Sequence, residues 1–224
     1  MRLLPETVQI QLALDVTDVE LAIRIAESTI EFVDRLEVGT PLINSEGLPR
    51  AISALRARFP EMPLIADPKI MDRGRQITRD CVEAGASGVI VEGGAPFETL
   101  EAVCEAATEL GTETYVDSLG VETVTELTAR IGGLPFDYMI LHRGKDEQTV
   151  GGRPPIEAVR AAAIERVLPA VAVAGGIRPD NVEECAQAPN VKVVIVGEAI
   201  ISSPSPRNVA AEIRRICDGA RTPV

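Results

Sequence analysis

The stretch from Ala66 to Asp72 places two carboxylates and one ammonium group close together, in the order Ala-Asp-Pro-Lys-Ile-Met-Asp. Asp67 and Lys69 follow an apolar run typical of a buried strand, and residues two apart in a strand face the same side. Both side chains are therefore expected to point out of one end of the strand, with Asp72 just beyond. A surface ion pair would also explain the motif, but burying a lysine between two carboxylates is costly unless the site uses it.

Ionisable residues or glycines follow nearly every other apolar run of the chain as well. They are Asp15, Glu37, Glu92, Asp117, His142 with Arg143, the pair Gly175-Gly176, and Gly197 with Glu198. The starts of the same runs carry no comparable set. This regularity is hard to attribute to random surface charge, and it predicts one site built from the ends of several strands.

Proton transfer and metal binding are the two chemistries that these residues suggest. His142 is the only histidine, and the ordinary pKa of histidine suits proton transfer at neutral pH. Glu37 and Asp67 end adjacent runs and together could hold Mg²⁺. The alternative is that both pair with Lys69 and bind no metal. A single histidine and unpaired cysteines make a zinc site a poor fit.

The glycines predict a phosphate site after the seventh and eighth apolar runs. Gly175-Gly176 and Gly197 each precede a turn or helix, where backbone N–H groups commonly hold phosphate. Glu198 would repel a phosphate unless its side chain points away, and Arg178 and Arg207 are nearby candidates for positive charge.

The elements that must position these residues alternate regularly along the chain. Eight apolar runs are expected as strands, at 8–14, 32–38, 63–66, 88–91, 114–116, 138–141, 170–174 and 191–196. Helices are expected near 18–30, 45–58, 74–84, 97–110, 121–131, 155–164, 179–187 and 206–218. Eight strand–helix units predict an α/β protein, a single (β/α)₈ TIM barrel domain over residues 1–224. A doubly wound open sheet is the alternative, because periodicity alone does not show closure.

Composition narrows the classes of protein further. The chain has 224 residues, of which 46% are hydrophobic and 3% aromatic, and its net charge is −12. No basic patch suggests nucleic acid as a partner, and no apolar run reaches the length of a membrane span. The four cysteines form no C-x-x-C pair and are expected to be buried free thiols. These features predict a soluble cytoplasmic protein.

With these residues identified, the chain resembles the orotidine-monophosphate-decarboxylase superfamily. Within it, the chain is most similar to 3-hexulose-6-phosphate synthases and 3-keto-L-gulonate-6-phosphate decarboxylases. The resemblance runs nearly end to end and combines E-x-G-T-P with D-x-K-x-x-D. The segments that carry it are Gln11 to Asp15, Glu37 to Ile43, Glu46 to Leu48, Ala66 to Asp72, His142 to Gln148, Val173 to Gly176 and Val196-Gly197.

The resemblance implies a metal-assisted carbon–carbon lyase acting on a sugar phosphate. Glu37 and Asp67 would hold Mg²⁺ against the oxygens of a 1,2-enediolate, and Lys69 would add positive charge to that intermediate. His142 would move protons. In the synthase the enediolate of ribulose 5-phosphate attacks formaldehyde, whereas in the decarboxylase it forms by loss of CO₂ and is then protonated.

The resemblance also implies a homodimer with shared active sites. Asp72 would reach across the interface into the partner's site, and Asp15 would position substrate hydroxyls. The loops at Gly175, Gly176, Gly197 and Glu198 would hold the phosphate.

Several activities remain open at this stage. The segment 37–48 and Met71-Asp72 favour the synthase, and Arg143 directly after His142 favours the decarboxylase, where such an arginine helps deliver a proton. A ribulose-phosphate 3-epimerase would need several histidines, and orotidine-monophosphate decarboxylase needs no metal. A sugar-phosphate binding protein without turnover is a further alternative.

Three positions depart from the pattern of the superfamily. Pro68 lies inside the D-x-K motif and has no N–H to donate, Arg75-Gln76 stands where synthases tend to be acidic, and Glu198 stands where relatives have glycine, serine or arginine. These departures leave room for a changed substrate or a phosphate held in a different way.

Overall fold

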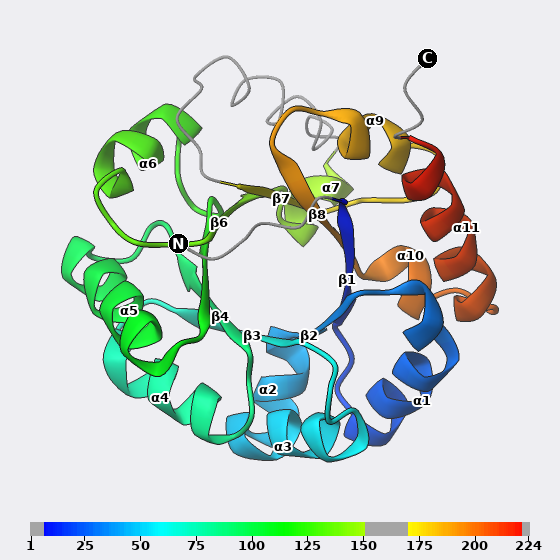
Figure 1. Ribbon diagram of the computed structural model, residues 1–224, viewed down its shortest axis with the longest axis horizontal. Coiled ribbons are helices and arrows are strands. Elements are labelled where there is room, and N and C mark those ends of the chain that lie inside the picture. Colours follow the sequence, from blue (N-terminus) through cyan, green and yellow to red (C-terminus); the bar gives the residue numbers. More distant parts are fainter. Residues whose placement is uncertain (1–6, 151–169, 221–224) are drawn as a thin grey trace.

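The computed structural model describes residues 7–150 and 170–220, and within them eight parallel strands form a closed barrel in sequence order (Figure 1). The strands are β1 (Gln9–Leu14), β2 (Arg35–Val38), β3 (Leu64–Ile70), β4 (Gly88–Glu92), β5 (Glu113–Asp117), β6 (Tyr138–His142), β7 (Val171–Ala174) and β8 (Val191–Val196). Because β8 pairs with β1, the predicted TIM barrel is confirmed and the open sheet is excluded.

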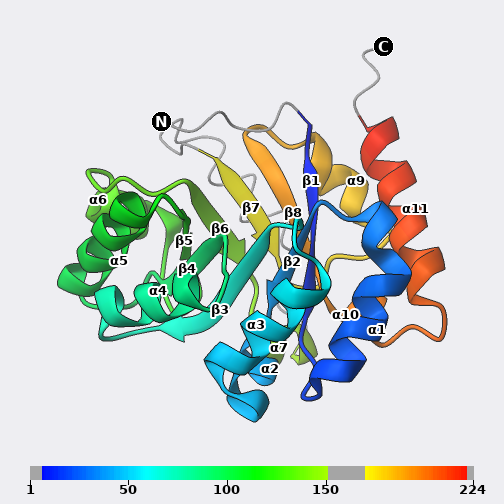
Figure 2. The same ribbon diagram turned by 60° about the horizontal axis from the view of Figure 1, so that its bottom comes forward.

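Helices surround the barrel as an outer ring (Figure 1). They are α1 (Val19–Thr29), the 3₁₀ helix η1 (Ile30–Phe32), α2 (Thr40–Glu46), α3 (Leu48–Arg58), α4 (Gly74–Glu83), α5 (Phe97–Leu110), α6 (Val124–Ile131), α7 (Lys145–Thr149), α9 (Val182–Gln187), α10 (Glu198–Ile201) and α11 (Pro206–Gly219). Figure 2 shows the short helices α2 and α7 at the end of the barrel toward which the strands run.

Alternating strand residues supply two apolar layers. Outward side chains such as Leu12 and Leu36 pack with the helices in the larger core cluster. Inward side chains such as Ile65, Ile90 and Ile140 fill the barrel interior. Burial on both faces explains why the strands appear as nearly continuous apolar runs in the sequence.

Several predicted elements differ from the observed ones. The helix expected over 45–58 is two helices, α2 and α3, because Gly47 between them has φ +81° and ends the first. The short helices α7 and α10 were not expected. The helix expected over 155–164 lies outside the described residues.

Strand β3 continues beyond Ala66, where the sequence suggested its end, and contains an irregularity. Ala66 pairs with Val89 and Ile70 with Val91, so three residues of β3 lie opposite Ile90 alone. Lys69 has φ +53°, a left-handed conformation that is uncommon for lysine. Pro68 fits here because a residue inside a bulge needs no ladder hydrogen bond.

The N-terminal ends of the strands carry a charged cluster that the sequence analysis did not predict. Arg35 forms an ion pair with Glu113 and donates hydrogen bonds to Gln9, at 2.6 Å, and to the hydroxyl groups of Tyr115 and Tyr138. The tyrosine rings stack with centroids 4.6 Å apart. These five residues are called the Arg35 cluster below. The sequence predicted no set of ionisable residues at this end comparable to that at the C-terminal ends. Arg35 lies inside the expected strand 32–38 and Glu113 directly precedes the strand expected at 114–116, and the two residues meet inside the barrel.

The cysteines and the helices agree with two further expectations. Cys81, Cys104, Cys185 and Cys217 are all buried free thiols, and burial raises the pKa of Cys81 to about 12. Among the described residues, the helices include none with the length and apolar character needed to cross a membrane.

Candidate active site

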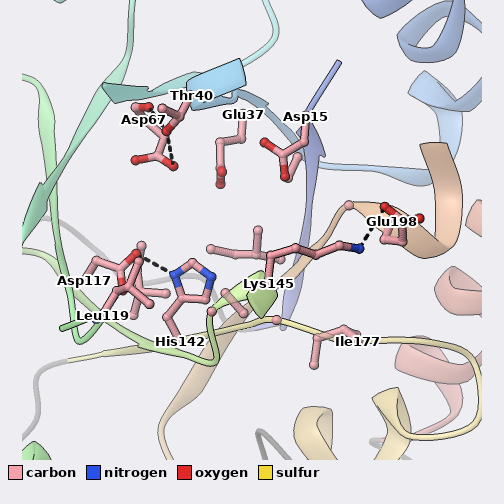
Figure 3. A pocket seen from close by; sticks show the side chains of 18 of the residues that line it. Asp15, Glu37, Thr40, Asp67, Asp117, Leu119, His142, Lys145, Ile177 and Glu198 are labelled. Carbon is pink, nitrogen blue, oxygen red and sulfur yellow. Dashed lines mark hydrogen bonds and ion pairs between the residues drawn. The ribbon is translucent and has the colours of Figure 1, made fainter. Parts of the chain in front are cut away.

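A pocket of about 490 Å³ opens at the C-terminal ends of the strands. Its polar lining residues include Asp15, Glu37, Thr40, Asp67, Lys69, Asp117, His142, Lys145, Gln148, Arg178 and Glu198. Figure 3 shows Asp15, Glu37 and Asp67 along one side of the pocket, with His142 and Asp117 across from them. The predicted convergence of strand ends therefore produces one cavity.

Lys69 lies at the centre of a buried ion cluster. Its Nζ is 3.1 Å from Asp67 Oδ2, 3.2 Å from Glu92 Oε1 and 3.4 Å from Asp117 Oδ2. Burial alone would lower the pKa of Lys69, but the three carboxylates outweigh burial and raise it. The three carboxylates therefore favour the charged form of Lys69. Together with His142, these four residues are called the Lys69 cluster.

His142 is held by Asp117 in a fixed orientation. The His142 Nδ1 lies 2.7 Å from Asp117 Oδ2, and the other oxygen of Asp117 accepts a hydrogen bond from the Leu119 N–H at 2.9 Å. Burial lowers the pKa of His142, whereas the hydrogen bond and charge of Asp117 raise it more strongly. Because Nδ1 is engaged, Nε2 is the nitrogen available to exchange a proton with a ligand.

Glu37 and Asp67 are two buried carboxylates with too few cationic partners. Burial and the charges of Asp67 and Asp15 raise the pKa of Glu37, and burial raises that of Asp67 despite the opposing charge of Lys69. Glu37 accepts a hydrogen bond from Gln11 Nε2 at 2.5 Å. Asp67 Oδ1 is buried and has no hydrogen-bond donor among the described residues. This unsatisfied oxygen fits a site that receives a cation.

The E-x-G-T-P segment fits the neighbouring strands for steric and hydrogen-bonding reasons. A Cβ on Gly39 would lie 2.1 Å from Asp15 Oδ1, so a larger residue would displace that carboxylate. The Thr40 hydroxyl donates to the carbonyl of Asp67 at 2.8 Å, which ties the start of α2 to β3. The motif thus holds the carboxylates of β1, β2 and β3 side by side.

The predicted phosphate loops also reach the pocket. Gly175 and Gly176 have φ +92° and +73°, and a Cβ on Gly175 would meet the Arg143 carbonyl oxygen at 2.0 Å. Gly197 and Glu198 line the pocket next to them. Lys145 Nζ lies 3.1 Å from Glu198 Oε2.

Two predicted site residues do not line the pocket. Asp72 lies on an exposed turn after β3, where its carboxylate accepts a hydrogen bond from the Arg73 N–H. Arg143 directs its guanidinium to the Glu147 carbonyl at 3.0 Å. Of the arginines considered for phosphate, Arg178 lines the pocket, whereas Arg207 pairs with Glu31 elsewhere.

Four residues of the site received no role from the sequence. Glu92 and Asp117 were identified only as strand ends, and Lys145 only as part of the segment His142 to Gln148 that carries the family resemblance. Gln11 could have been recognised as a polar residue in an apolar strand, two positions from Ala13 on the inward face. Among the described residues, no group of three or more histidine, cysteine or acidic side chains is arranged as a metal site.

Comparisons with known proteins agree with this architecture. The model of the orotidine 5'-phosphate decarboxylase / HUMPS family matches residues 8–213. The 3-hexulose-6-phosphate synthase of Staphylococcus epidermidis is 32% identical over 211 residues, covering 94% of this chain and 99% of that protein. The structure of 3-hexulose-6-phosphate synthase from Salmonella typhimurium has a TM-score of 0.91 at 32% identity, covering 96% of this chain and 100% of that one.

A decarboxylase structure is similar as well. The 3-keto-L-gulonate-6-phosphate decarboxylase from Vibrio cholerae has a TM-score of 0.84 at 28% identity, with 96% of this chain and 100% of that one covered. The family match extends over all eight strands and the complete pocket, so the chain belongs to the orotidine 5'-phosphate decarboxylase / HUMPS family.

Proposed function

We propose that the protein is an aldolase-type lyase with 3-hexulose-6-phosphate synthase activity, which condenses formaldehyde with ribulose 5-phosphate or catalyses the reverse reaction. The observation that carries this proposal is the pocket in which the buried carboxylates of Glu37 and Asp67, the ion-paired Lys69 and an oriented histidine meet, with Asp67 Oδ1 lacking a hydrogen-bond donor. Near full-length identity of 32% to proteins named 3-hexulose-6-phosphate synthase supports it.

Glu37 and Asp67 are the residues proposed to hold Mg²⁺. The donor set fits a hard divalent cation, because both ligands are carboxylates and Asp67 Oδ1 is buried without a donor. A cation would also offset the burial that raises the pKa of both groups, and the nearby negative charges that add to it: Asp67 and Asp15 for Glu37, and Asp117 for Asp67. When bound, Mg²⁺ supplies Lewis-acid stabilisation of negative charge on substrate oxygens.

Lys69 is proposed to stabilise negative charge on the substrate, and His142 is proposed to transfer protons. Lys69 keeps its proton and places fixed positive charge where the enediolate develops. His142 Nε2 takes the proton from the carbon next to the carbonyl of ribulose 5-phosphate. The carbon then bonds to formaldehyde, and the proton returns to the oxygen that was the formaldehyde carbonyl. Asp117 stabilises the imidazolium that exists between these steps.

The 3-keto-L-gulonate-6-phosphate decarboxylase is the second candidate activity, supported by the similarity to the Vibrio cholerae enzyme. The sequence feature that favoured it was Arg143, as a group that delivers a proton. The Arg143 guanidinium instead contacts the Glu147 carbonyl and does not line the pocket. This placement weakens the case for the decarboxylase relative to the synthase.

A homodimer with shared sites accounts best for Asp72, which is exposed outside its own pocket. If Asp72 completes the partner's site, mixing inactive Asp67→Ala and Asp72→Ala subunits creates one intact site in each heterodimer. Random mixing should then restore about a quarter of the wild-type rate. Recovery of no activity from a mixture shown to exchange subunits would exclude the shared site.

We also propose a cytoplasmic location for the protein. The four buried cysteines, which form no disulfide bond, suit a reducing compartment.

The proposed activity is tested by following formaldehyde loss with ribulose 5-phosphate, in Mg²⁺ and after treatment with EDTA. Consumption that stops in EDTA and returns with added Mg²⁺ is the expected result. Absence of consumption in Mg²⁺ would reject the synthase, and keto-gulonate phosphate would be the next substrate. Ligand binding that survives EDTA, with no turnover of either substrate, would favour a non-catalytic binding protein.

A further inference from the structure

An ion pair crosses the mouth of the pocket at the end assigned to the phosphate. Lys145 begins α7 and Glu198 begins α10, and Lys145 Nζ lies 3.1 Å from Glu198 Oε2. Figure 3 shows the Lys145 side chain extended over the pocket toward Glu198. Both residues line the pocket, so the pair forms part of its wall beside the loop at Gly197.

Glu198 is held in this position from its other side as well. The Ser202 hydroxyl donates to Glu198 Oε1 at 2.8 Å. This hydrogen bond and the charge of Lys145 lower the pKa of Glu198, so the carboxylate is ionised at neutral pH. The structure thus places a fixed negative charge beside Gly175, Gly176 and Gly197, where a phosphate group is expected to bind.

The other cations of the pocket are less able to receive that phosphate. Lys69 is surrounded by three carboxylates at the opposite wall, and Arg178 pairs with Asp180 at 3.2 Å. Of Lys145 and Arg178, the two cations away from the Lys69 cluster, Lys145 is the one whose carboxylate partner also lines the pocket. A phosphate entering here would therefore meet Lys145 and Glu198 together.

In the Lys145–Glu198 pair, a phosphate can replace Glu198 as the partner of Lys145 at little cost. Both side chains are more than half exposed, at 64% and 60%, and exposed ion pairs contribute little to stability. A phosphate monoester carries more negative charge than a carboxylate and offers several acceptor oxygens to one ammonium group. It should therefore displace Glu198 from Lys145 with a modest loss of affinity.

We propose that Lys145 binds the phosphate of the substrate and that Glu198 competes with this phosphate for Lys145. Glu198 holds Lys145 across the mouth when the pocket is empty and releases it when a sugar phosphate binds. The inference rests on the proposed function for the identity of the ligand. This competition makes Glu198 a specificity-determining residue. Glu198 sets how much more tightly the pocket binds a ligand with a terminal phosphate than the same ligand without one.

The test compares Glu198→Gln with Lys145→Gln and with the double variant. Glu101→Gln serves as a matched control, because Glu101 is an exposed residue of α5 and the change removes the same single charge. For Glu198→Gln, the KM for ribulose 5-phosphate and the dissociation constant of inorganic phosphate are expected to fall about two- to fivefold, the size of one exposed charge interaction. For Lys145→Gln, both constants should rise about tenfold or more.

The double variant separates competition from simple repulsion. If Glu198 acts by holding Lys145, its effect on phosphate affinity should disappear in the Lys145→Gln background. In that background Glu198→Gln should change phosphate affinity no more than Glu101→Gln does. An equal gain from Glu198→Gln with and without Lys145 would overturn the proposal. An unchanged or higher KM in the single Glu198→Gln variant would overturn it too.

Calorimetric binding of inorganic phosphate keeps this inference distinct from the proposed activity. Tighter phosphate binding by Glu198→Gln in a protein that consumes no formaldehyde would support the exchange and reject the synthase. Normal formaldehyde consumption with identical KM values for Glu198→Gln and Glu101→Gln would support the synthase and reject the exchange. Failure of both wild type and Glu198→Gln to bind phosphate would reject the exchange as well.

Discussion

The two ends of the barrel each contain a buried cation, but the two cations have very different surroundings. At the N-terminal end, Arg35 faces one carboxylate, Glu113, together with the neutral groups of Gln9, Tyr115 and Tyr138. At the C-terminal end, Lys69 faces the three carboxylates Asp67, Glu92 and Asp117. One end balances its charge and the other carries an excess of negative charge.

This difference separates a structural cluster from a functional one. In the Arg35 cluster the guanidinium donates to Gln9, Glu113 and both tyrosine hydroxyls, and the Tyr115 hydroxyl donates to Glu113. Burial raises the pKa of Tyr115 and Tyr138, which favours their neutral forms. In the Lys69 region, Asp67 Oδ1 has no donor and the pKa values of Glu37, Asp67 and Glu92 are all raised. A folded chain keeps such an imbalance when a ligand corrects it.

The largest expected effect is on activity, at the C-terminal end. Asp67→Ala should reduce the rate of formaldehyde consumption at least about a thousandfold, because it removes a proposed metal ligand and several kcal/mol of transition-state stabilisation. Stability should change little, since Lys69 keeps Glu92 and Asp117 as partners. Turnover and the thermal midpoint are measured on the same preparation, and a normal rate would remove Asp67 from the metal site.

The Arg35 cluster should respond in the opposite way. Arg35→Met removes the guanidinium that pairs with Glu113 and hydrogen-bonds Gln9, Tyr115 and Tyr138, and it should lower the free energy of unfolding by about 3 kcal/mol. The rate per folded molecule should remain near the wild-type value, because this cluster lies at the end of the barrel away from the pocket. Urea unfolding measures the first quantity, and the double variant Arg35→Met/Glu113→Gln should recover part of the loss. A stable but inactive Arg35→Met protein would contradict the division between the two ends.

His142 tests whether the Lys69 cluster moves protons. His142→Asn keeps a polar side chain next to Asp117 but removes the titratable nitrogen, so exchange of the proton on the carbon next to the carbonyl of ribulose 5-phosphate should slow about 100-fold or more. NMR in deuterated water follows this exchange without formaldehyde. Exchange at the wild-type rate would assign the base to another residue.

The sequence predicted the C-terminal end of the barrel much better than the N-terminal end. Apolar runs that stop at Glu37, Asp67 or His142 indicate strand ends directly, and parallel topology then brings those ends together. Arg35 lies inside the apolar run 32–38 and Glu113 directly before the run 114–116, so neither residue stands out in the sequence as part of a cluster. Their contacts depend on register between distant strands, which no local pattern encodes.

The pairing of Asp67 with Lys69 was predicted, although its structural cause differs from the prediction. A regular strand would align residues two apart, whereas β3 places three residues opposite Ile90 and turns Lys69 into a left-handed conformation. Pro68 is the local sign of this irregularity, but a bulge is defined by two strands. The Lys145–Glu198 pair could not be predicted from the sequence either, because its two residues follow different strands, β6 and β8, and meet only in the folded barrel.

Glu92 gives the smallest expected effect, and this effect tests directly whether the charges of the Lys69 cluster are balanced as those of the Arg35 cluster are. It lies behind Lys69 with its side chain 8% exposed, and burial together with the charge of Asp117 raises its pKa to about 7 from the ordinary value of 4.5. The folded state therefore holds this proton more tightly than the unfolded state does. The stability that Glu92 contributes is greatest below pH 4.5 and declines as the pH rises through 7.

Glu92→Gln should accordingly be more stable than the wild type at pH 8, by at most about 3 kcal/mol from a shift of this size. The difference should shrink steadily toward pH 5. Urea unfolding at several pH values in EDTA measures it, and Glu101→Gln controls for loss of one surface charge. If Glu92→Gln is less stable than the wild type at pH 8, the ion pair between Lys69 and Glu92 stabilises the fold, as the pair between Arg35 and Glu113 does. The Lys69 cluster would then be balanced in the folded state, and its excess of carboxylates would no longer argue for a bound cation.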